Sequence, residues 1–313
     1  MNLKYYIQIT CVHIYVHKMK KYLVVIGGAG FVGSNLIELL LKKTKYNILS
    51  YDNYSSGTIK NHIKNKRVNY IKAHTKDINR NLKSKKNNIL TIFHFGEFAR
   101  IFQSFNNLSE CLESNINGSL EVFKFCLSHK IKLIYSATSA SLGNYGNDKN
   151  LSPYAFTKTK NLELLNNFKN WFNLKYEVIF FYNVYGPRQI SKGKMATVIG
   201  IFEDHYIKKK PLPVVMPGSQ SRRFTHIEDT VNICYKAWKE NKCKFYSISN
   251  KQSYTIKAIA KMFNTKIRYL PQRKGERYAS SLVNQSLTNK IHKNFGKIKI
   301  RNYINNFIKS VQK

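Results

Sequence analysis

Short apolar runs recur through about the first 180 residues of the chain, and segments with helical spacing of apolar residues separate them. The runs are Tyr22–Ile26, Asn47–Tyr51, Val68–Lys72, Ile89–Phe95, Lys132–Ser136 and Glu177–Tyr182. The helical segments include Phe31–Leu41, Leu108–His129 and Tyr154–Phe172. Continuous apolar strands that alternate with helices are typical of a parallel sheet covered on both faces. The pattern therefore predicts an α/β fold with a doubly wound parallel sheet.

The pattern changes at both ends of this region. After about Asn183, loops punctuated by Pro and Gly alternate with short strands and helices, which predicts a smaller second α/β lobe over residues 183–313. Residues 1–18 are basic and aromatic, and their short apolar stretch lacks a small-residue cleavage site, so a signal peptide is disfavoured. Met19 opens the first strand, so we expect residues 19–182 to form the first domain and residues 1–18 to be an extension outside the core.

The charge of the chain is extreme, with 53 Lys and Arg residues against 16 Asp and Glu residues, a formal net charge of +37. One interpretation is a protein that binds nucleic acid or another polyanion. The other is a general bias toward lysine on the surface. The basic residues are scattered along the whole chain instead of clustering on one element, which favours the second interpretation. Anionic substrates would still be attracted electrostatically.

The cysteines indicate no metal site and no disulfide framework. They are Cys11, Cys111, Cys126, Cys234 and Cys243, an odd number without C-x-x-C spacing. This usage favours a reducing compartment, and we expect a cytoplasmic protein. No apolar run reaches the length that a membrane span needs.

A glycine-rich turn joins the first strand to the first helix, in the order Gly27-Gly28-Ala29-Gly30-Phe31-Val32-Gly33. Glycines allow a tight turn, close approach of the backbone to a pyrophosphate, and a helix N-terminus that faces the phosphates. Asp52 ends the next strand, where a carboxylate would bind the adenosine ribose hydroxyls and repel a 2′-phosphate. The turn predicts a dinucleotide site that prefers NAD over NADP, although Lys60 nearby would soften that preference.

The glycine spacing is Gly-x-x-Gly-x-x-Gly, and with it the chain after Met19 resembles the extended short-chain dehydrogenase/reductases of the nucleotide-sugar epimerase/dehydratase family. The resemblance implies a Rossmann-type NAD domain, a C-terminal lobe that binds the nucleotide sugar, and a homodimer formed through Leu108–His129 and Tyr154–Phe172. The cofactor-binding residues that it implies are Gly27, Gly30, Phe31, Val32, Gly33, Asp52, Asn53, Asp77 and Lys158.

The spacing Tyr-x-x-x-Lys occurs four times, so the spacing alone identifies no site. In the family that the chain resembles, the active-site tyrosine opens a long helix and a Ser or Thr follows the fifth strand. Only Tyr154, which follows Ser152-Pro153, has this setting. The matching hydroxyl is Thr138, with Ser139 as the alternative if the register differs by one residue.

The chemistry of this pair explains the spacing. A free phenol has a pKa of about 10 and is a poor base at neutral pH. A lysine one helical turn away lies on the same face, and its charge favours the phenolate. Tyr154 would then take a proton from a sugar hydroxyl while hydride leaves to NAD. Thr138 would bind the same oxygen, and Lys158 would also hold the nicotinamide ribose.

Substrate contacts are implied by three matches in the second lobe and one departure from the family pattern. Asn183 follows the sixth apolar run, while Arg222 and Arg273 match arginines that bind the nucleotide phosphates, which suit forked guanidinium donors. The departure is Phe93-His94-Phe95-Gly96-Glu97, where the family commonly has His-Leu-Ala-Ala. Glu97, with Arg100, is expected near the nicotinamide pocket and able to contact the sugar.

The reaction is expected to be an epimerisation. Dehydratases of the family carry Asp-Glu where this chain has Ser139-Ala140, which disfavours 4,6-dehydration. We favour a UDP-hexose 4-epimerase that works through a transient 4-keto sugar. The alternative is an ADP-glycero-manno-heptose 6-epimerase, because Lys192 matches a lysine that serves as a second base there. Another nucleotide-sugar reductase or dehydratase, an inactive NAD sensor and a nucleic-acid-binding protein on the same scaffold stay open.

Overall fold

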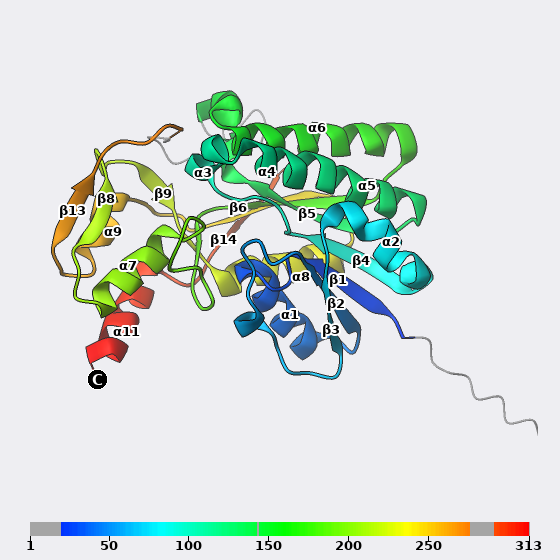
Figure 1. Cartoon of the computed structure of the whole chain (residues 1–313), viewed down its shortest axis with the longest axis horizontal. Coiled ribbons are helices and arrows are strands. Elements are labelled where there is room, and N and C mark those ends of the chain that lie inside the picture. The colour runs from blue at the N-terminus through cyan, green and yellow to red at the C-terminus, as the bar shows by residue number, and fades with distance from the viewer. Residues whose placement is uncertain (1–19, 143, 276–290, 313) are drawn as a thin grey trace, which may run out of the picture.

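The computed structural model describes residues 20–142, 144–275 and 291–312, so the expected extension at residues 1–18 lies outside the described residues. One eight-stranded sheet dominates the fold, in the order β14-β11-β6-β5-β4-β1-β2-β3 (Figure 1). Every neighbouring pair in it is parallel. Its strands are β1 Tyr22–Ile26, β2 Asn47–Asp52, β3 Val68–Lys72, β4 Ile89–His94, β5 Lys132–Thr138, β6 Tyr176–Phe181, β11 Phe245–Ser249 and β14 Ile291–Phe295.

The six runs predicted as strands are all strands, with ends that differ by at most about two residues. They are apolar throughout because both faces of the sheet are covered; in β5 every residue is buried. The predicted doubly wound α/β fold is therefore confirmed. None of the helices in the described parts of the chain combines the length and apolarity that crossing a bilayer requires.

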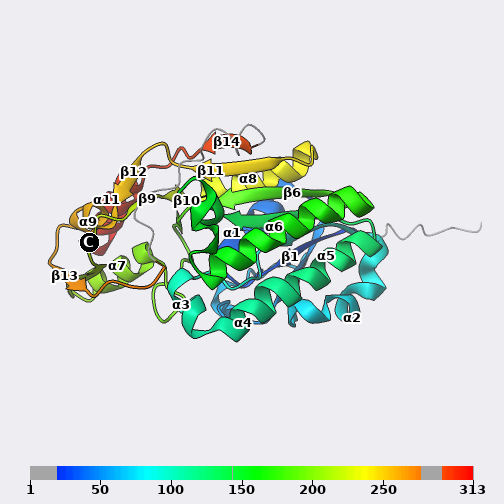
Figure 2. The same ribbon diagram turned by 90° about the horizontal axis from the view of Figure 1, so that it is seen from above.

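Two layers of helices cover the sheet (Figure 1), and Figure 2 looks down on the layer that contains α5 and α6. On one face lie α1 Phe31–Lys43 and α8 Ile227–Glu240, whose buried positions share an apolar cluster with β1. On the other face lie α2 Ile78–Leu82, α5 Ser119–Ser128 and α6 Pro153–Phe172. Short helices α3 Ile101–Asn106 and α4 Leu108–Leu112 lead into α5. Segments of 3-10 helix lie at Ile59–Asn61, Thr75–Asp77, Lys83–Asn88, Ser139–Leu142 and Asn144–Asn150.

The helix predicted over Leu108–His129 differs from the structure in its middle. A π-helical segment, Glu113–Gly118, separates α4 from α5. A π turn contains one more residue than an α turn, so it rotates the side chains that follow it. Here Asn115 is turned fully into the interior, where it contacts α6 and the loop after β4.

The second lobe has its own apolar core beyond the carboxyl ends of the sheet strands (Figure 1). Its elements are β7 Val184–Tyr185, α7 Val198–Ile207, β8 Leu212–Val215, β9 Ser221–Arg223, β10 Thr225–His226, β12 Ser253–Thr255, α9 Ile256–Lys261, β13 Ile267–Leu270 and α11 Ile300–Gln312. The chain after residue 182 does not stay in this lobe. Strands β11 and β14 return to the main sheet, because β11 pairs with β6 and then with β14. The change of pattern near residue 183 thus marks a new lobe and not the edge of the sheet.

Candidate active site

A cavity of about 590 Å³ opens at the carboxyl ends of the central strands, between the sheet and the second lobe. The strand order reverses between β1 and β4, and ligands of open parallel sheets bind at such a reversal. Most residues singled out in the sequence line this cavity. They are Gly27, Gly30, Phe31, Val32, Gly33, Asp52, Asn53, Glu97, Thr138, Tyr154, Lys158, Asn183, Arg222 and Arg273.

The glycine turn is packed too closely for other side chains at two positions. Gly27 has φ +79°, and a Cβ there would lie 2.8 Å from the Gly96 backbone nitrogen. A Cβ on Gly33 would lie 2.1 Å from the Gly27 carbonyl oxygen. The first turn of α1 is therefore pressed against the end of β1, and Gly30, Phe31 and Val32 line the cavity at the helix N-terminus, where a pyrophosphate would bind.

Asp52, the last residue of β2, is fixed beside this turn. One of its carboxylate oxygens accepts a hydrogen bond from the Ala29 N–H at 2.9 Å, and the other accepts one from the Tyr54 N–H at 2.7 Å. The side chain is 7% exposed, and burial raises its pKa from the usual range. A carboxylate in this position, with lone pairs left over, can accept hydrogen bonds from the vicinal hydroxyls of a ribose.

Thr138 and Tyr154 line the cavity from β5 and α6. Thr138 ends its strand, and its hydroxyl oxygen accepts a hydrogen bond from the Ala140 N–H at 3.1 Å, so the hydroxyl proton can be donated elsewhere. Tyr154 follows Pro153 in the first turn of α6, which the Ser152 hydroxyl caps by accepting from the Ala155 N–H. The cap and the proline fix where α6 starts, and hence where Tyr154 lies.

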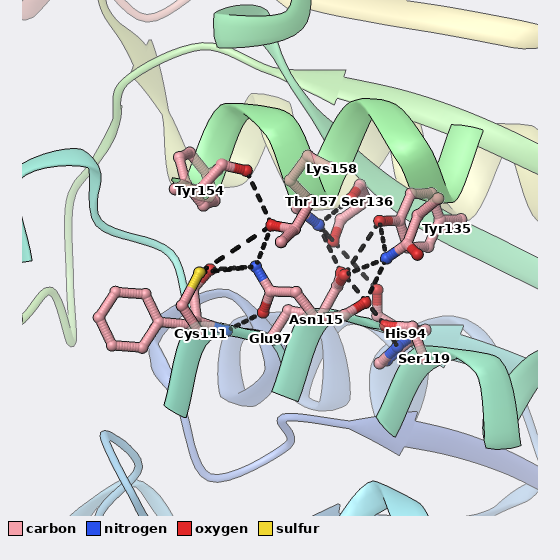
Figure 3. A network of polar contacts seen from close by, with 12 residues as sticks. His94, Glu97, Cys111, Asn115, Ser119, Tyr135, Ser136, Tyr154, Thr157 and Lys158 are labelled. Carbon is pink, nitrogen blue, oxygen red and sulfur yellow. Dashed lines mark hydrogen bonds and ion pairs between the residues drawn. The ribbon is translucent and has the colours of Figure 1, made fainter. Parts of the chain in front are cut away.

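Lys158 lies one turn further along α6, and its ammonium group is bound to protein groups (Figure 3). It donates to the Ser136 carbonyl at 2.5 Å and forms an ion pair with the carboxylate of Glu97. The ammonium also lies over the ring of Tyr135, 4.6 Å from its centre. The Lys158 and Glu97 side chains are only 4% and 1% exposed.

The position of Glu97 differs from the expectation that it contacts the sugar. Both of its carboxylate oxygens are bonded to protein, so its backbone borders the cavity while its charge is turned inward. The reason lies in its partners, because Ser119, Tyr135 and Asn161 all donate to one of its oxygens. These donors hold the carboxylate in the interior, away from the sugar end of the cavity.

Several residues of this network escaped the sequence analysis. Asn115 exchanges hydrogen bonds with the backbone of Phe98 and donates to Thr157, while Asn161 donates to Glu97. A signal existed on α6, because residues 154, 157, 158 and 161 repeat at helical spacing and share one face. The π turn that orients Asn115 leaves no comparable pattern.

His94 is a buried titratable residue beside the site. It is fully buried at the end of β4, where burial lowers its pKa to about 4. Its Nε2 lies 2.9 Å from the Ser119 hydroxyl, and its Nδ1 has no partner among the described residues. The imidazole is therefore neutral in the folded protein at neutral pH.

This neutral histidine predicts acid instability. Unfolded His94 binds a proton near pH 6.5, whereas folded His94 resists protonation down to about pH 4, so stability falls as the pH drops through that window. The full loss is roughly 3 kcal/mol. Urea unfolding between pH 7.5 and pH 4.5 measures it, and His94→Gln should lose that part of the pH dependence. An unchanged slope in the variant would contradict the assignment.

The second lobe supplies cations to the other end of the cavity. Arg222, on β9, is 8% exposed and donates to the Ser221 carbonyl. The guanidinium of Arg273 lies over the ring of Phe102, 5.2 Å from its centre. Asn183, just after β6, donates to the Arg223 carbonyl at 3.1 Å. Two guanidinium groups here can bind a diphosphate that enters with a sugar nucleotide.

Arg100 ties the two halves of the site together. Its guanidinium donates through Nε and Nη2 to the carbonyl of Met195, at 3.0 and 2.5 Å. Arg100 follows β4, whereas Met195 belongs to the segment before α7, and both line the cavity. The side chain therefore braces the sugar side of the cavity against the cofactor side.

Two expected site residues do not line this cavity. Asp77 immediately precedes α2, and its carboxylate forms an ion pair with Arg80 at 3.2 Å. Lys192 is 70% exposed and forms a 3.6 Å ion pair with Asp204. Beside Gly193, which has φ +78°, Lys194 lines the cavity, whereas Lys192 lines only a smaller adjoining pocket that shares Lys194 and Met195 with it. The structure does not bring Lys192 together with Tyr154.

Comparison with known proteins places these features in a wider set. A sequence model of the NAD dependent epimerase/dehydratase family matches residues 23–248. The chain is 29% identical over 228 residues to the uncharacterized UDP-glucose epimerase YtcB of Bacillus subtilis, covering 67% of this chain and 70% of that protein. It is 30% identical over 231 residues to the ADP-L-glycero-D-manno-heptose-6-epimerase of Brachyspira hyodysenteriae, with coverages of 67% and 70%. Among solved structures, the chain is similar to the UDP-N-acetylglucosamine 4-epimerase of Methanobrevibacter ruminantium in complex with UDP-N-acetylmuramic acid. The TM-score is 0.81 and the sequence identity is 25%, and the match covers 93% of this chain and 97% of that chain.

Proposed function

Because this chain belongs to the NAD-dependent epimerase/dehydratase family, we propose that it epimerises a nucleotide-activated sugar, most specifically a UDP-hexose at C4. One observation carries the proposal. Thr138, Tyr154 and Lys158 meet in a single cavity, with the glycine turn and Asp52 on one side and two arginines on the other. That arrangement suits a dinucleotide and a sugar nucleotide bound end to end.

The protein's own groups can carry the proton steps. NAD, when bound, supplies the acceptor and donor of the hydride. Tyr154 takes the proton of the sugar hydroxyl. It returns that proton after the 4-keto sugar has rotated in the site and presents its other face to the cofactor. The Thr138 hydroxyl donates to the same oxygen, and Lys158, one turn along α6 from Tyr154, supplies the positive charge that favours the phenolate. Asp52 favours a ribose with a free 2′-hydroxyl, hence NAD over NADP.

The cavity also supports epimerisation over dehydration. Ser139 and Ala140 both line it, so no carboxylate is available immediately after Thr138 to assist elimination. Epimerisation needs only oxidation, rotation of the keto sugar and return of the hydride. Heptose 6-epimerisation remains the second candidate because one relative that carries this activity is as similar as the UDP-glucose relative.

A substrate panel tests the proposal. Purified protein is incubated with UDP-galactose, UDP-N-acetylgalactosamine and ADP-glycero-manno-heptose, and the products are separated by chromatography. We expect conversion of a UDP-hexose without added oxidant or reductant. Conversion of the heptose alone would select the second candidate. Turnover of none of them, together with tight salt-sensitive binding of nucleic acid, would overturn the proposal.

Lys192 separates the two candidate mechanisms. Because its ammonium is exposed and paired with Asp204, Lys192→Ala should keep kcat within about threefold of wild type. The matched variant Lys194→Ala removes a cation that does line the cavity, and we expect it to raise KM. Steady-state kinetics with the accepted substrate measure both. An inactive Lys192→Ala beside an active Tyr154→Phe would show that the base has been misassigned.

We also propose that the protein is a cytoplasmic homodimer. Leu108, Leu112 and Phe156 are 47%, 37% and 39% exposed, and they lie on the contacting helices α4 and α6 (Figure 2). An apolar strip on two adjacent helices fits a four-helix contact with a second copy. Light scattering should give twice the chain mass of 36.5 kDa, and Leu108→Lys with Leu112→Lys should give a monomer. A monomeric wild type would contradict the proposal.

A further inference from the structure

Both oxygens of the Glu97 carboxylate are bonded to protein groups, so the carboxylate is not directed at a substrate. One oxygen accepts from Tyr135 at 2.9 Å, from Ser119 at 3.1 Å and from Asn161 at 3.1 Å. The other oxygen is paired with the ammonium of Lys158. Four elements, namely β5, α5, α6 and the loop after β4, thus supply one buried site for a single negative charge (Figure 3).

Within the part of the chain that the structure describes, Glu97 is the only carboxylate in contact with the ammonium of Lys158. Its remaining partners are the carbonyl and hydroxyl of Ser136, at 2.5 and 3.5 Å, and the ring face of Tyr135. These neutral groups orient the ammonium but do not replace a counter-ion. A buried cation that loses its only anion becomes expensive to keep charged.

We propose that Glu97 is a positioning residue that keeps Lys158 charged and directed at the Ser136 carbonyl, so that Lys158 acts on Tyr154 and on the ribose of the cofactor. The inference rests on the proposed function and goes beyond it. In this role Glu97 acts indirectly, by way of Lys158. The sequence had instead predicted that Glu97 contacts the sugar directly. The consequence is an enzyme whose activity at alkaline pH depends on a residue that touches no substrate.

The groups around the pair offer no second counter-ion for Lys158 among the described residues. Among the described residues, the titratable groups that interact with the pair are His94 on β4, Cys111 on α4 and Tyr135 on β5, while Arg100 after β4 interacts with Tyr154 on α6. Burial raises the pKa of the Tyr135 hydroxyl well above its usual range, so it stays protonated and donates to Glu97. His94 is neutral and Arg100 is cationic. None of these neighbours is a carboxylate, so the ion pair of Lys158 rests on Glu97.

Glu97→Gln tests the role of the charge with nearly the same shape. On the alkaline side, the pH at which kcat/KM falls to half should move down by at least about one unit, because a buried ammonium without a counter-ion loses its proton more easily. The matched control is Glu177→Gln. Glu177 is fully buried and pairs with Lys132 at 2.6 Å, outside the cavity. Both variants should lower the melting temperature, but only Glu97→Gln should move the pH profile.

NADH binding gives a second measurement that needs no substrate. For wild type and Glu177→Gln, the affinity measured by NADH fluorescence should be equal at pH 7 and pH 9. For Glu97→Gln it should be about tenfold weaker at pH 9, where Lys158 no longer makes a charge-assisted hydrogen bond to the ribose. Equal affinities at both pH values, with an unmoved rate profile, would overturn the inference and leave the proposed function intact.

Glu97→Asp keeps the inference testable if the glutamine variant does not fold. The shorter carboxylate weakens the ion pair without abolishing it, so we expect a smaller shift in the same direction. A wild-type rate profile and wild-type NADH binding in a folded Glu97→Asp, with Glu97→Gln unfolded, would mean that Glu97 only supports the fold. If no nucleotide sugar is turned over while NADH binding shows the expected pH dependence, the proposed function fails and the role of Glu97 stands.

Discussion

Tyr154→Phe should reduce kcat by about 10²- to 10⁴-fold and leave NAD bound. A general acid–base group contributes about this much, and the variant removes only the hydroxyl that exchanges the proton. The ring, the start of α6 and the cofactor contacts all remain, because Ser152 and Pro153 fix the helix start without the hydroxyl. Steady-state kinetics on the accepted UDP-sugar measure the loss, and absorbance of the released nucleotide after denaturation measures bound NAD.

Tyr235→Phe is the matched control for this variant. Tyr235 has the same spacing to Lys239 but lies on α8, and it does not line the cavity. We expect it to keep kcat within about twofold of wild type, since it leaves the proton path untouched. The assignment would fail if Tyr154→Phe kept more than about a tenth of wild-type kcat, or if both variants lost activity equally.

Gly33→Ala should abolish tight NAD binding. The new methyl group would lie 2.1 Å from the Gly27 carbonyl oxygen, which is backbone and can move only if α1 separates from β1. Overpacking of this kind costs about 1–3 kcal/mol, and it falls where the first turn of α1 must meet the pyrophosphate. We expect at least tenfold weaker NADH binding by fluorescence titration, together with a lower melting temperature.

Gly200→Ala is a control with a similar clash in the other lobe. Its methyl group would lie 2.5 Å from the Ile190 carbonyl oxygen, in the segment that borders the sugar end of the cavity. We expect it to lower the melting temperature and to raise KM for the sugar nucleotide, with NADH affinity close to wild type. Loss of NADH affinity in both variants would mean that general destabilisation, and not the glycine turn, explains the first result.

The sheet could be predicted from the sequence because strands buried on both faces are continuous apolar runs. Six continuous apolar runs became six strands, and Gly27 and Asp52 fell at the ends of the strands where a cofactor site was expected. The strands β11 and β14 were not predicted. They follow the second lobe along the chain, and β14 in particular exposes much of its surface at the edge of the sheet. Edge strands carry a weaker apolar pattern.

Site residues could be predicted only where a single helix or strand sets their relative positions. The spacing of Tyr154 and Lys158 is set within α6, and the structure keeps both in the cavity. The inward turn of Glu97 depends on Tyr135, Ser119 and Asn161, which come from three other segments, so no local pattern could show it. Likewise, Lys192 has a family-like position along the chain, but the turn at Gly193 decides which lysine reaches the cavity.

The return of β11 and β14 to the main sheet has a consequence for synthesis. After β10 the chain crosses between the lobe and the sheet several times. It enters the sheet as β11 and returns to the lobe for β12, α9 and β13. It then enters the sheet again as β14 and ends in the lobe as α11. A ribosome must therefore release the chain beyond Phe295 before the cofactor half can complete its sheet. Neither half can finish folding as an independent unit during translation, and a truncation near residue 183 would remove two strands of the sheet along with the lobe.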